Sequence, residues 1–334
     1  MKTFLFVGAI VVLFLTSNTT AVAGTFVPPR FTVTAEISET ALIAGAPLYV
    51  YLTVTREEDG NPELATVSLT SINDNVRLQI DDLNAQEVKR RPRQPWPAVN
   101  GLEFLLFKPL GAGESYTKTL IVHRWSSTAL PAGSYTVVVE APRLNYYMEK
   151  NRSEWHPVLE KPFRKAIPLK ILPPDHERVA RIFDEMLTAV TAESTPWSDR
   201  YRALDSIIFA QGPDALASQL GLLAAMEKDT VRFGYGQKEI VTMLWYIVQS
   251  ADVATARALA ALARGPVFGT NLDGEDHSGR GIWPMLGWAI HELHRTGSPE
   301  VQAVTKELVE VVPDKPGLVE MTFQHGGMQF DKDY

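Results

Sequence analysis

The chain changes its hydrophobic period within residues 163–190, FRKAIPLKILPPDHERVARIFDEMLTAV. Residues 163–172 have the period of two that is typical of a β-strand, and two prolines end this run. Because proline has no N–H for a strand ladder and disfavours helix in the residue before it, the pair predicts a domain boundary at 172–174. Asp175 is an expected helix N-cap, and a helical period follows it. The apolar residues at this helical spacing are Val179, Ile182, Phe183, Met186, Leu187 and Val190.

Short runs rich in β-branched and aromatic residues fill the chain before this boundary, and turn residues separate them. Leu48, Val50, Leu52 and Val54 share one face of such a run, as the buried face of an antiparallel strand requires. Eight such strands without a helix predict a β-sandwich. The expected strands are 31–37, 47–55, 66–71, 76–80, 103–110, 115–122, 133–140 and 163–172.

The run LPAGSYTVVV at residues 130–139 combines a Pro/Gly turn with a following tyrosine and a β-branched strand. It resembles a late strand of bacterial immunoglobulin-like domains, and the resemblance extends over about 140 residues. This fold occurs in many unrelated secreted proteins, including surface adhesins and a small class of proteinase inhibitors, so the resemblance implies a fold and little about function. We predict an N-terminal immunoglobulin-like antiparallel β-sandwich.

Helical periodicity continues from Asp175 to residue 312. After the first helix, three helix-turn-helix pairs repeat one plan, and their turn acids Asp214, Asp252 and Glu300 stand 38 and 48 residues apart. The spacing resembles HEAT-like repeats, in which each pair hides its apolar face by stacking on its neighbours. We predict a HEAT-like α-solenoid, with an ordinary helical bundle as the alternative. The expected helices of these pairs are 198–210, 213–227, 237–249, 252–263, 282–295 and 299–311.

The first residues have the pattern of a secretory signal peptide. Lys2 gives one positive charge, residues 4–15 are apolar or small, and Ala21-Val22-Ala23 is a small-x-small cleavage site. The apolar run is too short to cross a bilayer as a helix, which takes about 20 residues. We therefore expect an exported protein, periplasmic or extracellular, without a transmembrane anchor after cleavage. The expected domains are a signal peptide at 1–23, a β-sandwich at 24–174, a helical domain at 175–312 and a tail at 313–334.

Composition sets further limits on function. The 334 residues are 45% hydrophobic and 21% charged, which is typical of a globular protein, and none is cysteine. A chain without cysteine has no thiol catalysis and no disulfide. Residues 24–174 carry a net charge of +1 and residues 175–334 a net charge of −9, so the chain has no field that attracts nucleic acid.

No motif in the chain predicts a catalytic centre. His291 and His294 stand three residues apart on an expected helix, whereas a zinc protease places its two histidines four apart. Surface histidines near the C-terminus of a helix, where the helix dipole favours them, are the simpler interpretation.

A long connection at residues 264–283 contains five glycines together with polar and aromatic side chains. Connections of this length are uncommon in compact domains and are often functional. Oxygen ligands stand at alternate positions, as in loops that bind calcium, although the spacing excludes an EF-hand. We predict a ligand or ion site here, with a solvated insertion as the alternative. Its candidate residues are Asp273, Asp276, His277, Arg280 and Trp283, with Arg232 and Tyr235 from the preceding loop.

Two insertions in the β part are candidates for contact with a partner. Residues 89–97 combine four cations with a proline-rich stretch that is unsuited to a central strand. Residues 142–161 carry tyrosine and tryptophan, which are enriched in binding hot spots. These side chains contact an external partner or, alternatively, seal the junction with the acidic helical domain or simply pack within their own loops. The candidates are Arg90, Arg91, Arg93 and Trp96 in the first insertion and Tyr146, Tyr147 and Trp155 in the second.

These observations favour an exported, non-enzymatic binding or scaffold protein that presents the loops of a β-sandwich and a short helical solenoid. Two alternatives stay open: a metal-dependent hydrolase with its site in residues 264–283, and an inhibitor of an exported proteinase that acts through a loop of the sandwich. The expected partner is a protein, and no cofactor is expected apart from a calcium-type ion.

Overall fold

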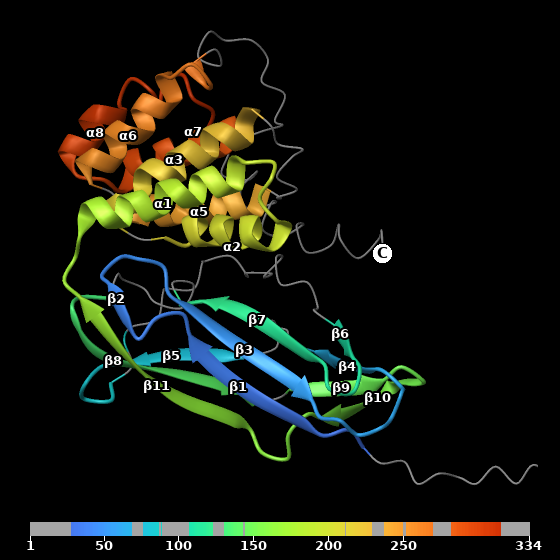
Figure 1. Ribbon diagram of the computed structural model, residues 1–334. Coiled ribbons are helices and arrows are strands. Elements are labelled where there is room, and N and C mark those ends of the chain that lie inside the picture. Colours follow the sequence, from blue (N-terminus) through green and yellow to red (C-terminus); the bar gives the residue numbers. More distant parts are fainter. Residues whose placement is uncertain are drawn as a thin grey trace, which may run out of the picture.

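The computed structural model describes residues 28–68, 76–86, 88, 107–122, 130–142, 144–210, 212–228, 237–249, 252–269 and 282–314. Within them, β-sheets form the N-terminal part of the chain and helices form the C-terminal part (Figure 1). The last strand ends at Leu172, and the first helix begins at His176. The predicted order of strands and then helices is therefore confirmed. The expected signal peptide lies outside the described residues.

The described strands form three sheets that bring distant segments of the chain together. One sheet has the order β1-β3-β7, a second β2-β11-β8-β5 and a third β10-β9-β4-β6. β2 pairs with β11 in parallel, which departs from the predicted antiparallel arrangement, because the chain passes from the first sheet to the second after β1 instead of returning by a hairpin. The strands are β1 (Phe31–Ile37), β2 (Ala41–Ile43), β3 (Tyr49–Arg56), β4 (Ala65–Ser68), β5 (Arg77–Asp81), β6 (Phe107–Leu110), β7 (Ser115–Ile121), β8 (Gly133–Ala141), β9 (Asn145–Met148), β10 (Asn151–Pro157) and β11 (Phe163–Leu172).

Alternation along β3 builds the core of the β part. Leu48, Val50, Leu52 and Val54 are fully buried, whereas the residues between them are half-buried. The prediction that these four side chains share a buried face is confirmed. They join buried residues from the other sheets in one hydrophobic cluster.

The segment 142–161, predicted as an insertion, contains two strands that form the β9–β10 hairpin. Tyr146 and Met148 of β9 are buried, whereas β10 is exposed along nearly its whole length. Because β10 buries so little, its sequence lacks the hydrophobic alternation that marks a strand. The sequence pattern therefore misses the hairpin.

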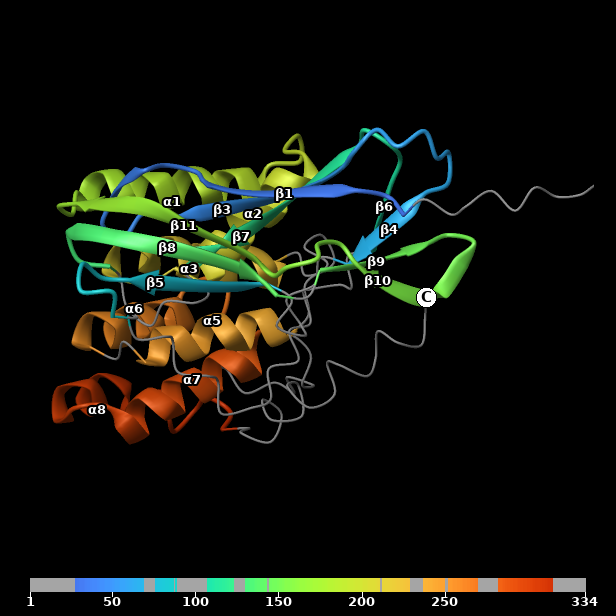
Figure 2. The ribbon, with the colours of Figure 1, turned by 90° about the horizontal axis from the view of Figure 1, so that it is seen from below.

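The seven described helices lie in two layers. In one layer α1, α3, α6 and α8 are successive neighbours, and in the other α2, α5 and α7 are. Each predicted helix-turn-helix pair contributes its first helix to one layer and its second helix to the other, and Figure 2 shows the pairs following one another. The helices are α1 (His176–Thr191), α2 (Trp197–Ile208), α3 (Pro213–Lys228), α5 (Gln237–Gln249), α6 (Val253–Arg264), α7 (Trp283–Thr296) and α8 (Pro299–Thr305).

The helix ends follow local sequence. Asp175 caps α1 as predicted, because its carboxylate accepts a hydrogen bond from the backbone N–H of Arg178 at 3.0 Å. α8 ends at Thr305 and not at residue 311, since three valines and a proline follow by residue 313 and are poor helix formers. No described helix is long and apolar enough to cross a membrane.

The junction between the two parts brings the β2–β3 connection, the start of β3 and β7 against the helices α1 and α2. The hydroxyls of Tyr49 and Ser206 are 2.8 Å apart, and the guanidinium of Arg202 lies 5.8 Å from the centre of the Tyr49 ring. A Cβ at Gly45 would lie 3.6 Å from Val179 of α1, so the two parts touch there. Burial raises the pKa of the Tyr49 hydroxyl.

Candidate functional site

Most of the predicted site residues lie outside the described chain. The basic insertion, the loop before α5 and the acidic part of 264–283 are among them, so the predicted ligand or ion site stays a prediction. The described candidates are Trp283 and the aromatic residues Tyr146, Tyr147 and Trp155. The candidates outside the described chain are Arg90, Arg91, Arg93, Trp96, Arg232, Tyr235, Asp273, Asp276, His277 and Arg280.

Trp283 lies in the core of the helical part. It is buried at the start of α7 and stacks against Phe268, with the ring centres 6.2 Å apart. Nearby, the carboxylate of Glu227 accepts a hydrogen bond from the backbone N–H of Ile282 at 2.8 Å. This bond joins the end of α3, before the loop that leads to α5, to the end of the connection 264–283.

Two aromatic side chains meet on the outer face of the β9–β10 hairpin. The rings of Tyr147 and Trp155 are 4.9 Å apart between centres and cross at 82°, an edge-to-face contact, and Trp155 remains 46% exposed. The hairpin lies at the end of the β part away from the helices in both views (Figures 1 and 2). The alternative that these aromatic residues seal the junction is therefore wrong.

Tyr146 and His156 occupy the inner face of the same hairpin. Tyr146 is buried, and its ring centre lies 4.9 Å from that of Phe31 and 5.3 Å from that of His156. Burial raises the pKa of Tyr146. The structure thus places Tyr146, one of the predicted contact residues, in the core and leaves Tyr147 to face outward.

Polar contacts fix the tip of the hairpin. The backbone N–H of Lys150 donates to Glu63 at 2.8 Å, and the guanidinium of Arg152 lies 2.6 Å from the carboxylate of Glu149. The Thr66 hydroxyl also donates to Glu149, and this hydrogen bond, with the Arg152 charge, holds the pKa of Glu149 below its usual range. A tip fixed in advance loses less conformational freedom when it binds a partner.

A cavity of about 240 Å³ lies beside the hairpin, between its base and the loop that leads to β11. Asn145 and Pro157 line it and, by strand alternation, share the outer face of the hairpin with Tyr147 and Trp155, whereas its other lining residues include the buried Leu144. Pockets for drug-sized molecules are larger, roughly 300–1,000 Å³, so this cavity suits a single side chain. Its apolar wall consists of Pro142, Leu144, Pro157, Leu159 and Pro162.

The two histidines of α7 contact different partners. Nε2 of His291 is 3.1 Å from the carbonyl oxygen of Val312, and Nδ1 of His294 is 2.9 Å from the Thr305 hydroxyl. Both contacts tie α7 to the segment that follows it. Among the described residues, no group of three or more His, Asp or Glu side chains is placed to hold a metal ion.

Sequence reasoning singled out the aromatic residues of the hairpin but missed the cavity. Its walls come from two segments, 141–145 and 157–162, that meet only when β9 and β10 pair. The one signal in the sequence is the cluster of prolines at positions 142, 157 and 162, which limits strand pairing on both sides of the hairpin.

Comparisons with known proteins leave the family open. No protein-family model and no curated protein matches the chain. Two crystal structures of Salmonella alpha-2-macroglobulin, one of a point mutant and one of the protein reacted with methylamine, match with 11% and 10% sequence identity and a TM-score of 0.22 each. The match covers 88% of this chain and 27% of that protein. A TM-score of this size supports no argument about fold or function.

Proposed function

We propose that the protein is an exported, non-enzymatic binding protein and that the outer face of the β9–β10 hairpin contacts a protein partner. This proposal rests on one observation: Tyr147 and Trp155 form an edge-to-face pair beside a cavity sized for one side chain. Tyrosine and tryptophan give a large contact area at low cost in conformational entropy. A partner side chain held in the cavity would be shielded from water, which is the setting of most binding hot spots.

Side chains rather than main-chain pairing carry this recognition. β10 is an edge strand of its sheet in the described chain, which in principle permits strand addition. However, the pairing register shifts between Asn151 and His156, and Pro157 has no N–H to donate. Both features hinder the addition of a partner strand to β10. The aromatic pair and the cavity are therefore the parts of the hairpin suited to binding.

We also propose the finer architecture expected from the sequence. Support for an immunoglobulin-like β-sandwich comes from the sheets β1-β3-β7 and β2-β11-β8-β5, whose buried residues belong to one cluster. The alternation of helices between two layers supports a HEAT-like solenoid. Export to the periplasm or the exterior rests on the signal-peptide pattern at 1–23.

Photo-crosslinking in expressing cells tests the proposed contact. The variant Tyr147→p-benzoylphenylalanine should give a defined protein adduct on irradiation. The same replacement at Arg257, an exposed residue of α6 in the helical part, is the matched control and should give none. No adduct at position 147, or equal adducts at both positions, would overturn the proposal.

A further inference from the structure

The cavity beside the β9–β10 hairpin has a mixed lining. Its buried lining residues, Ala141 and Leu144, are apolar, whereas Asn145, Glu160 and Lys161 line it with polar groups. Glu160 and Lys161 carry opposite charges, so the lining is neutral overall and electrostatic attraction does not favour a charged ligand. An entirely apolar ligand would offer the polar side chains no hydrogen bond in exchange for the water that it displaces.

The three polar side chains of the lining provide both donors and acceptors of hydrogen bonds. The carboxylate of Glu160 accepts, the ammonium of Lys161 donates, and the amide of Asn145 does both. A hydroxyl group also donates and accepts, so a ligand with several hydroxyls can bond to all three side chains. The lining therefore favours an uncharged ligand that is rich in hydroxyls and has an apolar part to pack against Leu144.

The aromatic pair extends this surface along the hairpin. Asn145 lies two residues before Tyr147 in β9, about 7 Å along the strand, and the two share its outer face. The exposed ring of Trp155 packs against Tyr147 edge to face. The flat faces of a sugar ring carry C–H groups, which pack favourably on the negative face of an aromatic ring. The pair is therefore suited to a sugar ring next to one in the cavity.

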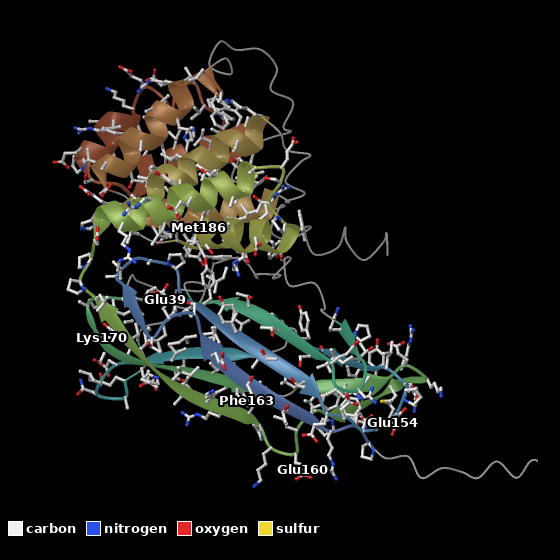
Figure 3. All side chains as sticks on the ribbon, viewed as in Figure 1. Glu39, Glu154, Glu160, Phe163, Lys170 and Met186 are labelled. Carbon is white, nitrogen blue, oxygen red and sulfur yellow. The ribbon has the colours of Figure 1, made fainter. Side chains whose placement is uncertain are left out.

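The size and position of the cavity agree with a sugar ligand. Its volume is about 240 Å³. A cavity of roughly 150 Å³ takes up benzene, and a six-membered sugar ring with its hydroxyls is larger than benzene. Figure 3 labels Glu160 beside the cavity and Glu154 on β10, and both lie on the side of the β part away from the helices. A ligand of several rings can therefore extend from the cavity along the hairpin without meeting the helical part.

We propose that the hairpin face binds an uncharged glycan that the partner protein carries. One sugar ring lies in the cavity, and the next packs against Tyr147 and Trp155. Exported proteins carry glycans on their surface loops, and the partner of an exported protein is itself outside the cytoplasm. The proposal rests on the proposed function, because it names the group of the partner that the hairpin recognises.

Periodate treatment of the partner tests the glycan. The partner is the protein identified in the adduct at position 147, and mild periodate opens sugar rings that bear neighbouring hydroxyls. Measured by biolayer interferometry against the purified wild-type chain, this treatment should raise the dissociation constant at least about tenfold, since several hydrogen bonds are lost together. Partner exposed to quenched periodate is the control and should bind as before. Glycan released from untreated partner should compete with it.

Two variants test whether the sugar lies in the cavity. Asn145→Ala and Lys161→Ala should each raise the dissociation constant for untreated partner about five- to tenfold, and neither should change it for periodate-treated partner. Lys161 is exposed in a loop, so its loss leaves folding intact. Gln302→Ala removes an exposed amide of α8 in the helical part and should change neither constant. Wild-type binding of untreated partner by both cavity variants would overturn the proposal.

The crosslink at position 147 separates this proposal from the proposed function. A protein adduct whose partner binds equally well before and after periodate overturns the glycan and leaves the protein contact standing. An adduct that contains polysaccharide and no protein overturns the protein contact and the partner-borne glycan together. Absence of any adduct overturns both.

Discussion

Tyr146 and Tyr147 are neighbours in the sequence but belong to opposite faces of one hairpin. Tyr146 is buried against Phe31, whereas Tyr147 meets the exposed ring of Trp155. Strand alternation thus separates two roles within two residues. Side chains that face inward hold the fold, and the outward pair of Tyr147 and Trp155 forms the proposed contact surface.

Arg56 makes several inward hydrogen bonds at this end of the β part. It is fully buried, and its guanidinium binds both carboxylate oxygens of Asp59, at 2.9 and 3.0 Å, and the carbonyl of Leu110 at 3.0 Å. Arg56→Met should lower the free energy of unfolding by about 3–5 kcal/mol, because it leaves Asp59 and the buried carbonyl without their donor. Urea unfolding measures the loss.

Arg164→Met is the matching substitution at an outward-facing arginine. Arg164 also pairs with a carboxylate, Glu140, at 2.9 Å, but its side chain is mostly exposed. The expected loss is below about 1 kcal/mol, as for other surface ion pairs. Equal losses in Arg56→Met and Arg164→Met would break the distinction between inward and outward contacts.

The two tyrosines give the sharpest form of the comparison. Tyr146→Ala should lower the free energy of unfolding by about 3 kcal/mol, since it opens a cavity against Phe31. Tyr147→Ala should lower it by about 1 kcal/mol or less, because it removes one aromatic contact at a partly exposed site. Thermal unfolding of both variants tests the difference, and the opposite ranking would contradict the assignment of faces.

Acid should weaken the inward contact of Asp59. The hydrogen bond from Arg56 holds the pKa of Asp59 below its ordinary value in the folded protein. The stability that this shift contributes is present above the unfolded-state pKa, near 3.8, and is lost as the pH falls through the lower folded-state pKa. Asp59→Asn should therefore lose less stability than the wild type below about pH 4. Urea unfolding over a pH series checks this, and identical slopes would count against it.

The turn after β5 that contains Ala85 should show the smallest effect, with the opposite sign. Ala85→Gly should raise the free energy of unfolding by about 0.5–1 kcal/mol, because glycine accepts the positive φ without strain. Ala41→Gly, at an exposed strand position without a positive φ, is the control and should lower it. A loss of stability in Ala85→Gly would show that the turn is not strained.

Strong periodicity made part of the fold predictable. The expected runs at 31–37, 163–172 and 237–249 have the same bounds as β1, β11 and α5, because their apolar residues keep one period over most of each run. β2 was missed because it is three residues long and pairs in parallel with a distant strand. α8 was overextended because Leu308 and Val312 are buried and keep a helical spacing after the helix has ended.

The candidate site was predictable only in part. The residue types that favour binding, tyrosine and tryptophan, directed attention to Tyr147 and Trp155. Tyr147 and Trp155 face outward and Tyr146 faces inward because side chains alternate along the strands of the hairpin. This assignment could not be predicted, since the second strand has no hydrophobic pattern. The cavity is not visible in the sequence, because its lining comes from both sides of that hairpin.

Radical footprinting of tryptophan tests most directly the claim that the outward face of the hairpin is a contact surface. Trp155 and Trp197 are both exposed, at 46% and 59%, but Trp197 lies on α2, away from the hairpin. The two residues should be labelled to similar extents in dilute purified protein. In expressing cells, Trp155 should be protected while Trp197 is not. Equal labelling of Trp155 in dilute solution and in cells would contradict the account.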